Sequence, residues 1–238
     1  MEYSFTWQKA QFEPVIIISV VTLGFLIYLV LTSSQKLKKS FIKNEENNTS
    51  WIIFQRLTGL LFFGIIPFLF STLLFKKNIS QSGISEINLS ESLLWIAGMA
   101  FIIIPMSFFA TKKPDNLDMY PQIRKKEWSK GLLILSASTW TIYLIAYEYM
   151  FRGFLLLGLV PHFGVWTAFA LNLAFYSLTH IPKGFNETIG ALPFGAIICL
   201  LTLKTGTIWI ALGAHMCLAL SNEWFSLRHH PEITFIKK

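Results

Sequence analysis

Four ionisable side chains stand inside apolar stretches in the second half of the chain. Glu148 and Arg152 lie in YEYMFRGFLLLGLV. His180 ends FALNLAFYSLTH, and His215 lies within IWIALGAHMCLALSN. A charge in hydrocarbon is costly and usually persists where it faces a polar partner or a water-filled cavity. Because these residues come from separate stretches, they predict one shared polar site inside a membrane.

The spacing of Glu148 and Arg152 places them on one face of a helix, since they are four residues apart. One interpretation is an ion pair that only neutralises itself. The other is that the arginine fixes the carboxylate while the carboxylate takes part in chemistry. Tyr147 and Tyr149 flank the glutamate, and either hydroxyl could hydrogen-bond within the site.

The two histidines differ in their surroundings. His180 ends an apolar stretch, and the proline two residues later stops the helix, so a satisfied interfacial histidine is one interpretation. His215 lies in the middle of its stretch, after Gly213 and Ala214, which allow close helix packing. Asn222 follows two turns further along the same face. Neutral histidine can act as a base, a donor or a metal ligand.

Counting residues along straight helices gives the depth of each group. Glu148 and His215 should lie at similar depth, while His180 and Asn222 should share a second level about 9–12 Å nearer the cytoplasm. Glu187, in HIPKGFNETIGALPFG, is either a first-turn charge that complements a helix dipole or a second carboxylate beside His180. Arg56, in an earlier stretch, is expected to snorkel toward the interface.

Composition assigns the chain to the membrane proteins. Of its 238 residues, 53% are hydrophobic, 14% are charged and 22 are Phe. Continuous apolar runs near the roughly 20 residues needed to span a bilayer recur along it, whereas a membrane β-barrel would show alternation. We predict an all-α polytopic membrane helix bundle with about seven transmembrane helices. The expected spans are 14–32, 51–75, 92–110, a segment within 131–157, 164–180, 188–203 and 207–224.

Loop charges predict the orientation. Fourteen of the 20 Lys and Arg residues fall in loops 33–50, 111–130 and 181–187 and the C-terminal tail, and four fall on the other side. This asymmetry predicts an integral protein of a bacterial-type cytoplasmic membrane with its N-terminus outside and its C-terminus cytoplasmic. The net charge of +7 is therefore a topology signal, and no nucleic-acid partner is expected. The expected organisation is a three-span region in 1–130, four helices in 131–224 and a tail in 225–238.

Three segments resemble the motifs of the CPBP intramembrane proteases, also called the Abi or type II CAAX endopeptidase family. YEYMFRG, FYSLTH and KTGTIWIALGAH correspond to EExxxR, FxxxH and HxxxN or HxxxD. The resemblance covers roughly residues 131–224. Tyr147 occupies the first glutamate position and Glu148 the second. Ala219 stands four residues after His215, and the nearest amide is Asn222.

The resemblance implies an endopeptidase that hydrolyses a peptide bond of a membrane-embedded or lipidated, CAAX-like substrate at the bilayer. A carboxylate, Glu148 or Glu187, would polarise a water together with His180. His215, helped by Asn222, would donate to the developing oxyanion. Arg152 would hold the glutamate ionised.

No cofactor is required by this chemistry. A version with a divalent metal such as zinc would use Glu148, His180 and His215 as ligands and keep one position open. The lack of an HExxH pair and the spread of these residues over three helices favour the metal-free version.

Two other functions remain open from the sequence. Tyr147 and Ala219 favour a catalytically inactive family member that acts as a membrane scaffold or a bacteriocin-immunity protein. A small transporter or channel could also line its pathway with buried charges. Against it, no internal repeat or pair of broken helices indicates alternating access.

Overall fold

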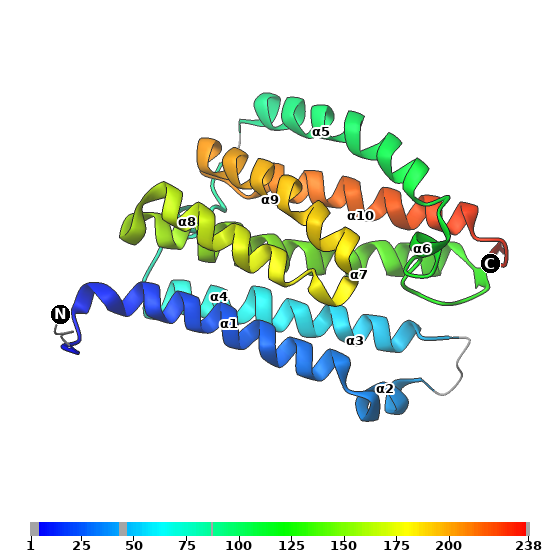
Figure 1. Ribbon diagram of the computed structural model, residues 1–238, viewed down its shortest axis with the longest axis horizontal. Coiled ribbons are helices and arrows are strands. Elements are labelled where there is room, and N and C mark those ends of the chain that lie inside the picture. The colour runs from blue at the N-terminus through cyan, green and yellow to red at the C-terminus, as the bar shows by residue number, and fades with distance from the viewer. Residues whose placement is uncertain (1–4, 43–46, 87, 237–238) are drawn as a thin grey trace.

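Long apolar helices run side by side along one axis of the molecule, with the N-terminus at one end and the C-terminus at the other (Figure 1). The computed structural model describes residues 5–42, 47–86 and 88–236, so residues 43–46 of the predicted loop 33–50 and the last two residues of the tail lie outside the described residues. The predicted all-α membrane bundle is confirmed.

The first half of the chain forms one edge of the bundle and, through α5, the opposite edge (Figure 1). α1 and the helix that contains α3 and α4 lie side by side, and the latter widens twice into π-helical turns. The elements are a 3-10 turn (Lys9–Gln11), α1 (Phe12–Ser33), α2 (Gln35–Phe41), α3 (Thr49–Gly59), a π-helical stretch (Leu60–Ile65), α4 (Ile66–Leu69), a second π-helical stretch (Phe70–Leu74), a 3-10 turn (Ile79–Ser82) and α5 (Leu89–Ala110).

The second half supplies the middle of the bundle, and its two strands pair in parallel, which ties the loop before α7 to the tail after α10. The elements are α6 (Pro114–Leu117), β1 (Glu127–Trp128), α7 (Lys130–Glu148), a π-helical stretch (Tyr149–Leu157), α8 (Gly158–Leu178), a 3-10 turn (Ile181–Lys183), α9 (Phe185–Thr205), α10 (Trp209–His229) and β2 (Thr234–Phe235).

Five stretches of the described chain are long and apolar enough to cross a membrane: Lys9–Ser33, Thr49–Leu74, Leu89–Ala110, Lys130–Lys183 and Phe185–Thr205. The fourth covers two of the expected spans, and its helix breaks between them at Gly164, whose φ of 75° favours glycine. α10 is not among the five, because His215, Asn222 and Glu223 lower its hydropathy. The chain is thus an integral membrane protein, and the count of seven spans stays a prediction.

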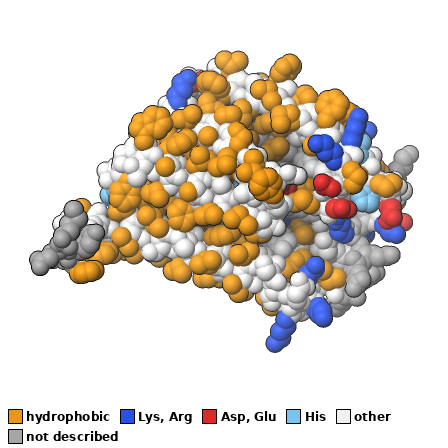
Figure 2. All heavy atoms as spheres, viewed as in Figure 1, with side chains coloured by type: hydrophobic (Ala, Val, Ile, Leu, Met, Phe, Trp, Pro, Cys, Tyr) orange, Lys and Arg blue, Asp and Glu red, His pale blue; other side chains and the backbone are white. Residues whose placement is uncertain are grey.

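The surface separates apolar and charged regions. In Figure 2 hydrophobic side chains cover the middle of the molecule, and most charged side chains gather at the end where α2, α6 and the C-terminus lie. On α5, Phe101 is 82% exposed and Leu94 is 74% exposed, as expected for a helix that faces lipid. In contrast, the π-helical stretch from Met150 to Leu156 is buried throughout. The interior of the bundle is therefore built around this stretch.

The expected snorkelling of Arg56 is wrong, because the interior supplies acceptors for its guanidinium. The side chain is only 4% exposed. Its Nη1 donates to the Ser136 carbonyl and to Thr139 Oγ1, both at 2.8 Å, and its Nη2 donates to Gln122 Oε1 at 3.0 Å. The guanidinium also lies over the ring of Trp140, 4.9 Å from its centroid. Arg56 therefore ties α3 to α7 and to the loop before it.

Candidate active site

The junction between α7 and the π-helical stretch carries the first two predicted residues. Glu148 ends α7, and Arg152 lies one turn later, within a type of turn that is common at functional sites. Both side chains are fully buried, and Arg152 Nε lies 3.3 Å from Glu148 Oε2. The predicted ion pair is therefore confirmed.

α10 brings His215 directly onto this pair. Its Nδ1 lies 2.5 Å from Glu148 Oε1. A carboxylate only accepts, so Nδ1 carries the donated proton and Nε2 points away from the glutamate. The expected common depth of these two residues is confirmed by the contact. Gly213 has the packing role expected of it, because a Cβ there would lie 2.5 Å from the Ile96 side chain of α5.

Tyr147 connects His180 to the group formed by Glu148, Arg152 and His215. The rings of His180 and His215 both meet the ring of Tyr147 nearly edge-on, with centroids 6.4 and 5.6 Å away. The Tyr147 hydroxyl lies 2.7 Å from Thr179 Oγ1, so the residue in the first glutamate position is turned toward α8. His180 Nδ1 donates to the Tyr176 carbonyl at 2.8 Å, which leaves Nε2 as an acceptor.

Asn172 of α8 joins the site, although the sequence analysis did not single it out. Its Oδ1 accepts from Arg152 Nη1 at 2.7 Å, and its Nδ2 donates to the Phe151 carbonyl. The guanidinium also lies 4.4 Å from the centroid of the Tyr176 ring, and Cys199 Sγ lies 3.0 Å from Asn172 Oδ1. The sequence feature that could have identified this residue is a single amide side chain within the apolar segment FALNLAF.

The structure does not bring Asn222 into this group. Its Oδ1 accepts from Asn116 Nδ2 at 3.2 Å, beside α6. Seven residues of helix carry it about 10 Å beyond His215, to the end of the bundle where α6 offers a partner. The expectation that Asn222 assists His215 is therefore corrected.

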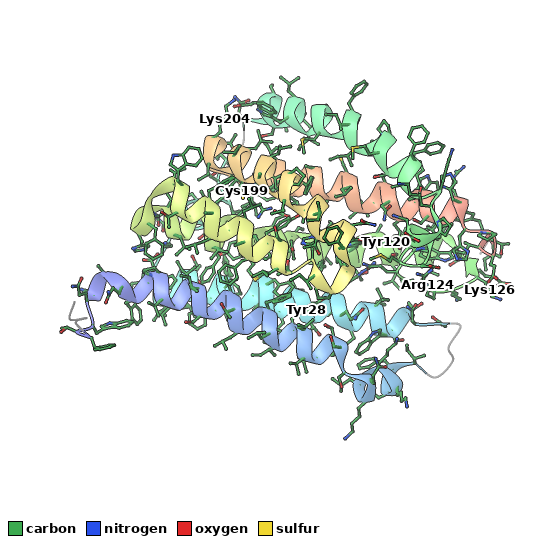
Figure 3. All side chains as sticks on the ribbon, viewed as in Figure 1. Tyr28, Tyr120, Arg124, Lys126, Cys199 and Lys204 are labelled. Carbon is green, nitrogen blue, oxygen red and sulfur yellow. The ribbon has the colours of Figure 1, made fainter. Side chains whose placement is uncertain are left out.

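The side-chain partners of Glu187 are Tyr120 and Lys183 rather than the histidines. Its Oε1 accepts from the Tyr120 hydroxyl at 3.0 Å, and Lys183 Nζ is 3.7 Å from its other oxygen. Burial, followed by the Glu187 carboxylate, raises the pKa of Tyr120 well above its usual value, so the phenol stays a donor. Glu187 stands in the first turn of α9, as the helix-dipole interpretation expects. In Figure 3 Tyr120 lies toward the charged end and Cys199, which contacts Asn172, lies inside the bundle.

Some of the buried polar atoms that lack an aligned hydrogen bond belong to the ion pair. Among the described residues, Glu148 Oε2, Arg152 Nε and Arg152 Nη2 are buried without an aligned hydrogen bond. The second buried acid differs, because Glu223 accepts from Ser136 Oγ at 2.9 Å and from the Gln122 backbone at 3.2 Å. Orphaned buried groups are rare in folded proteins and often mark function. Glu148 therefore has one oxygen without an aligned hydrogen bond, whereas both oxygens of Glu223 accept one.

The residues that a metal-dependent mechanism would use are Glu148, His180 and His215. Within the described residues, no group of three or more His, Cys, Asp and Glu side chains is arranged to hold an ion. Glu148 and His215 contact one another directly, and His180 Nδ1 contacts a backbone carbonyl. Both contacts use Nδ1, so Nε2 of each histidine faces away from these partners.

A cavity of about 240 Å³ lies between α7 and α10, the two helices that carry Glu148 and His215. Its wall is mainly apolar and includes three tryptophans. The lining residues are Trp128, Leu133, Ser136, Ala137, Trp140, Leu220, Glu223, Trp224 and Leu227.

Together, the apolar helices and the buried acid, imidazole and guanidinium groups define an integral membrane protein with a polar site in its interior. Residues 121–221 match the family described as type II CAAX prenyl endopeptidase Rce1-like. The match contains Glu148, His180 and His215, and it confirms the family that the three motifs indicated. No curated protein and no solved structure matches the chain.

Proposed function

We propose that the chain is an intramembrane endopeptidase that hydrolyses a peptide bond in a membrane-associated or lipidated, CAAX-like substrate. The observation that carries the proposal is the 2.5 Å contact between His215 and the fully buried Glu148. The family assignment supports the same class of reaction at a coarser level. A carboxylate that orients an imidazole inside a dry site is a recurring arrangement in hydrolysis.

The two histidines have different roles in the proposed mechanism. His180 Nε2 takes a proton from water while the water oxygen attacks the scissile carbonyl carbon, and it returns the proton to the departing amine. His215, protonated and paired with Glu148, donates from Nε2 to the oxyanion of the tetrahedral intermediate. Glu148 has no exposed surface and therefore positions His215 rather than contacting water. Arg152 balances its charge.

The membrane arrangement follows the same proposal. The stretch Lys130–Lys183 would cross twice, on either side of Gly164, and α10 would cross once, which makes seven crossings with the other helices. The charged end seen in Figure 2 would face the cytoplasm. A substrate anchored by a lipid chain would then approach the site along the helices from that side.

The cavity between α7 and α10 is where we propose that the lipid chain of the substrate lies. Ala137→Phe places a ring against its wall and is expected to raise KM for a lipidated peptide about tenfold, the effect of excluding roughly two methylene groups at about 0.8 kcal/mol each. The kcat should stay unchanged. The measurement is steady-state hydrolysis in proteoliposomes. Ala97→Phe, on the exposed face of α5, is the matched control, and equal KM values for both variants would contradict the assignment.

The proposal is tested with the full chain reconstituted in liposomes. A farnesylated peptide with a C-terminal CAAX sequence is expected to lose its last residues at one bond, identified by product mass, whereas the unmodified peptide is cleaved more slowly. If no peptide is cleaved and cells expressing the chain survive a bacteriocin challenge, the protein is an inactive relative. Solute flux through the liposomes would indicate a transporter instead.

A further inference from the structure

Asn172 connects the side chain of Arg152 to the backbone of the π-helical stretch in which Arg152 lies. It lies on α8 and is fully buried. Its amide contacts Arg152 on one side and the Phe151 carbonyl of the π-helical stretch on the other. Neither contact involves the histidines, so Asn172 is outside the reacting groups of the proposed mechanism.

The orientation of this amide follows from its partners. A guanidinium only donates and a carbonyl only accepts, so Oδ1 must face Arg152 and Nδ2 must face Phe151. Both ends of the amide are therefore in use, and the side chain has one orientation. The chain of contacts then continues from Arg152 Nε to Glu148 Oε2 at 3.3 Å and from Glu148 Oε1 to His215 Nδ1 at 2.5 Å.

We propose that Asn172 is a positioning residue, which holds the Arg152 guanidinium against Glu148 and thereby sets the orientation of His215. The inference deepens the proposed function and rests on it. Asn172 accepts a hydrogen bond from the Arg152 guanidinium and donates one to the carbonyl of Phe151, the residue before Arg152. Arg152 therefore cannot turn away from Glu148 without breaking one of these contacts. The carboxylate is consequently held with one oxygen toward the arginine and the other toward the histidine.

Asn172→Asp tests this role because it keeps the shape of the side chain and changes its charge. The new carboxylate loses the donor to Phe151 and competes with Glu148 for Arg152. We expect kcat to fall about tenfold, with KM unchanged. This is the lower end of the effect seen when the hydrogen-bond partners that orient metal-binding side chains are replaced. The measurement that distinguishes positioning from a purely structural role is the NMR resonance of the His215 Nδ1 proton, which a purely structural role would leave unchanged. Its resonance, in protein labelled with ¹⁵N-histidine, should move upfield from the position set by a short bond to a carboxylate.

Two further variants complete the experiment. Asn172→Leu removes both contacts without adding charge and should change the resonance and kcat in the same direction. Ser177→Ala, which alters a buried hydroxyl of α8 that has no hydrogen-bond partner among the described residues, should change neither. Unchanged resonance and kcat in both Asn172 variants would overturn the proposal. Failure of both to yield folded protein would assign Asn172 to the fold and overturn it as well.

The readouts separate this inference from the proposed function. A wild-type chain that cleaves no peptide, but whose His215 resonance moves upfield in Asn172→Asp, would refute the protease and support the positioning role. A wild-type chain that cleaves the peptide with the same kcat and the same His215 resonance as Asn172→Asp would support the protease and refute the positioning role.

Discussion

His180→Ala is expected to abolish hydrolysis of the lipidated peptide without loss of folded protein. The variant removes the base of the proposed mechanism, whose positioned proton transfer contributes on the order of 10²–10⁴ in rate. It leaves the Glu148–Arg152 pair untouched, because among the described residues the ring of His180 packs on the Tyr147 and Tyr176 rings and its hydrogen bond goes to the Tyr176 carbonyl. Single-turnover rates in proteoliposomes and thermal unfolding in detergent provide the two measurements.

Matched controls lie at the other end of the bundle. His162→Ala removes a histidine that lies 3.4 Å from Glu13, and Glu91→Gln removes a carboxylate that lies 3.4 Å from Lys204. Figure 3 places Lys204 at the end away from Lys126. Both controls should hydrolyse the peptide at the wild-type rate. Normal cleavage by His180→Ala would refute the proposed base.

Local geometry explains which parts of the site could be predicted from sequence. Glu148 and Arg152 meet because four residues of helix place side chains on one face, whatever surrounds them. Counting residues along the helices placed Glu148 and His215 at similar depth, and their contact agrees with this count. The break at Gly164 also fell between two expected spans, where the apolar runs separate. These features depend on spacing within one helix or on length alone.

Other features depend on partners that are distant in sequence. The Nη atoms of Arg56 donate to Ser136, Thr139 and Gln122, all more than 60 residues away, so its sequence context resembled that of a snorkelling arginine. Asn222 pairs with Asn116 because a short helix in the longest polar stretch folds against α10. Sequence pattern gives no register between such elements.

The π-helical turns are a third feature that could not be predicted from the sequence pattern. Because each widened turn takes an extra residue, the face presented after it rotates, and hydrophobic periodicity does not report the change. The stretch Tyr149–Leu157 begins directly after Glu148, contains Arg152 and presents the Phe151 carbonyl to Asn172. An isolated amide in an apolar run is less costly than a charge, so Asn172 carried a weaker signal than the ionisable groups.

Arg152→Ala is expected to lower the free energy of unfolding by about 3–5 kcal/mol, the effect of leaving a buried charge without its partner. Glu148 and Arg152 both have fully buried side chains, so no water replaces the lost contact. Asn172 and the Tyr176 ring lose a partner in the same variant. Activity should fall as well, because Glu148 would no longer be held toward His215. Chemical unfolding in detergent measures the change.

The double variant Arg152→Ala with Glu148→Gln isolates the charge from the packing. Each single substitution leaves one member of the Glu148–Arg152 pair without its counter-charge, whereas the double substitution removes both charges of the pair, so it should be more stable than either single variant. Arg228→Ala, which removes an exposed arginine over Trp224, is the control and should change stability little. Stabilities that simply add in the cycle would mean that the two side chains do not interact. The buried pair would then not be what orients His215.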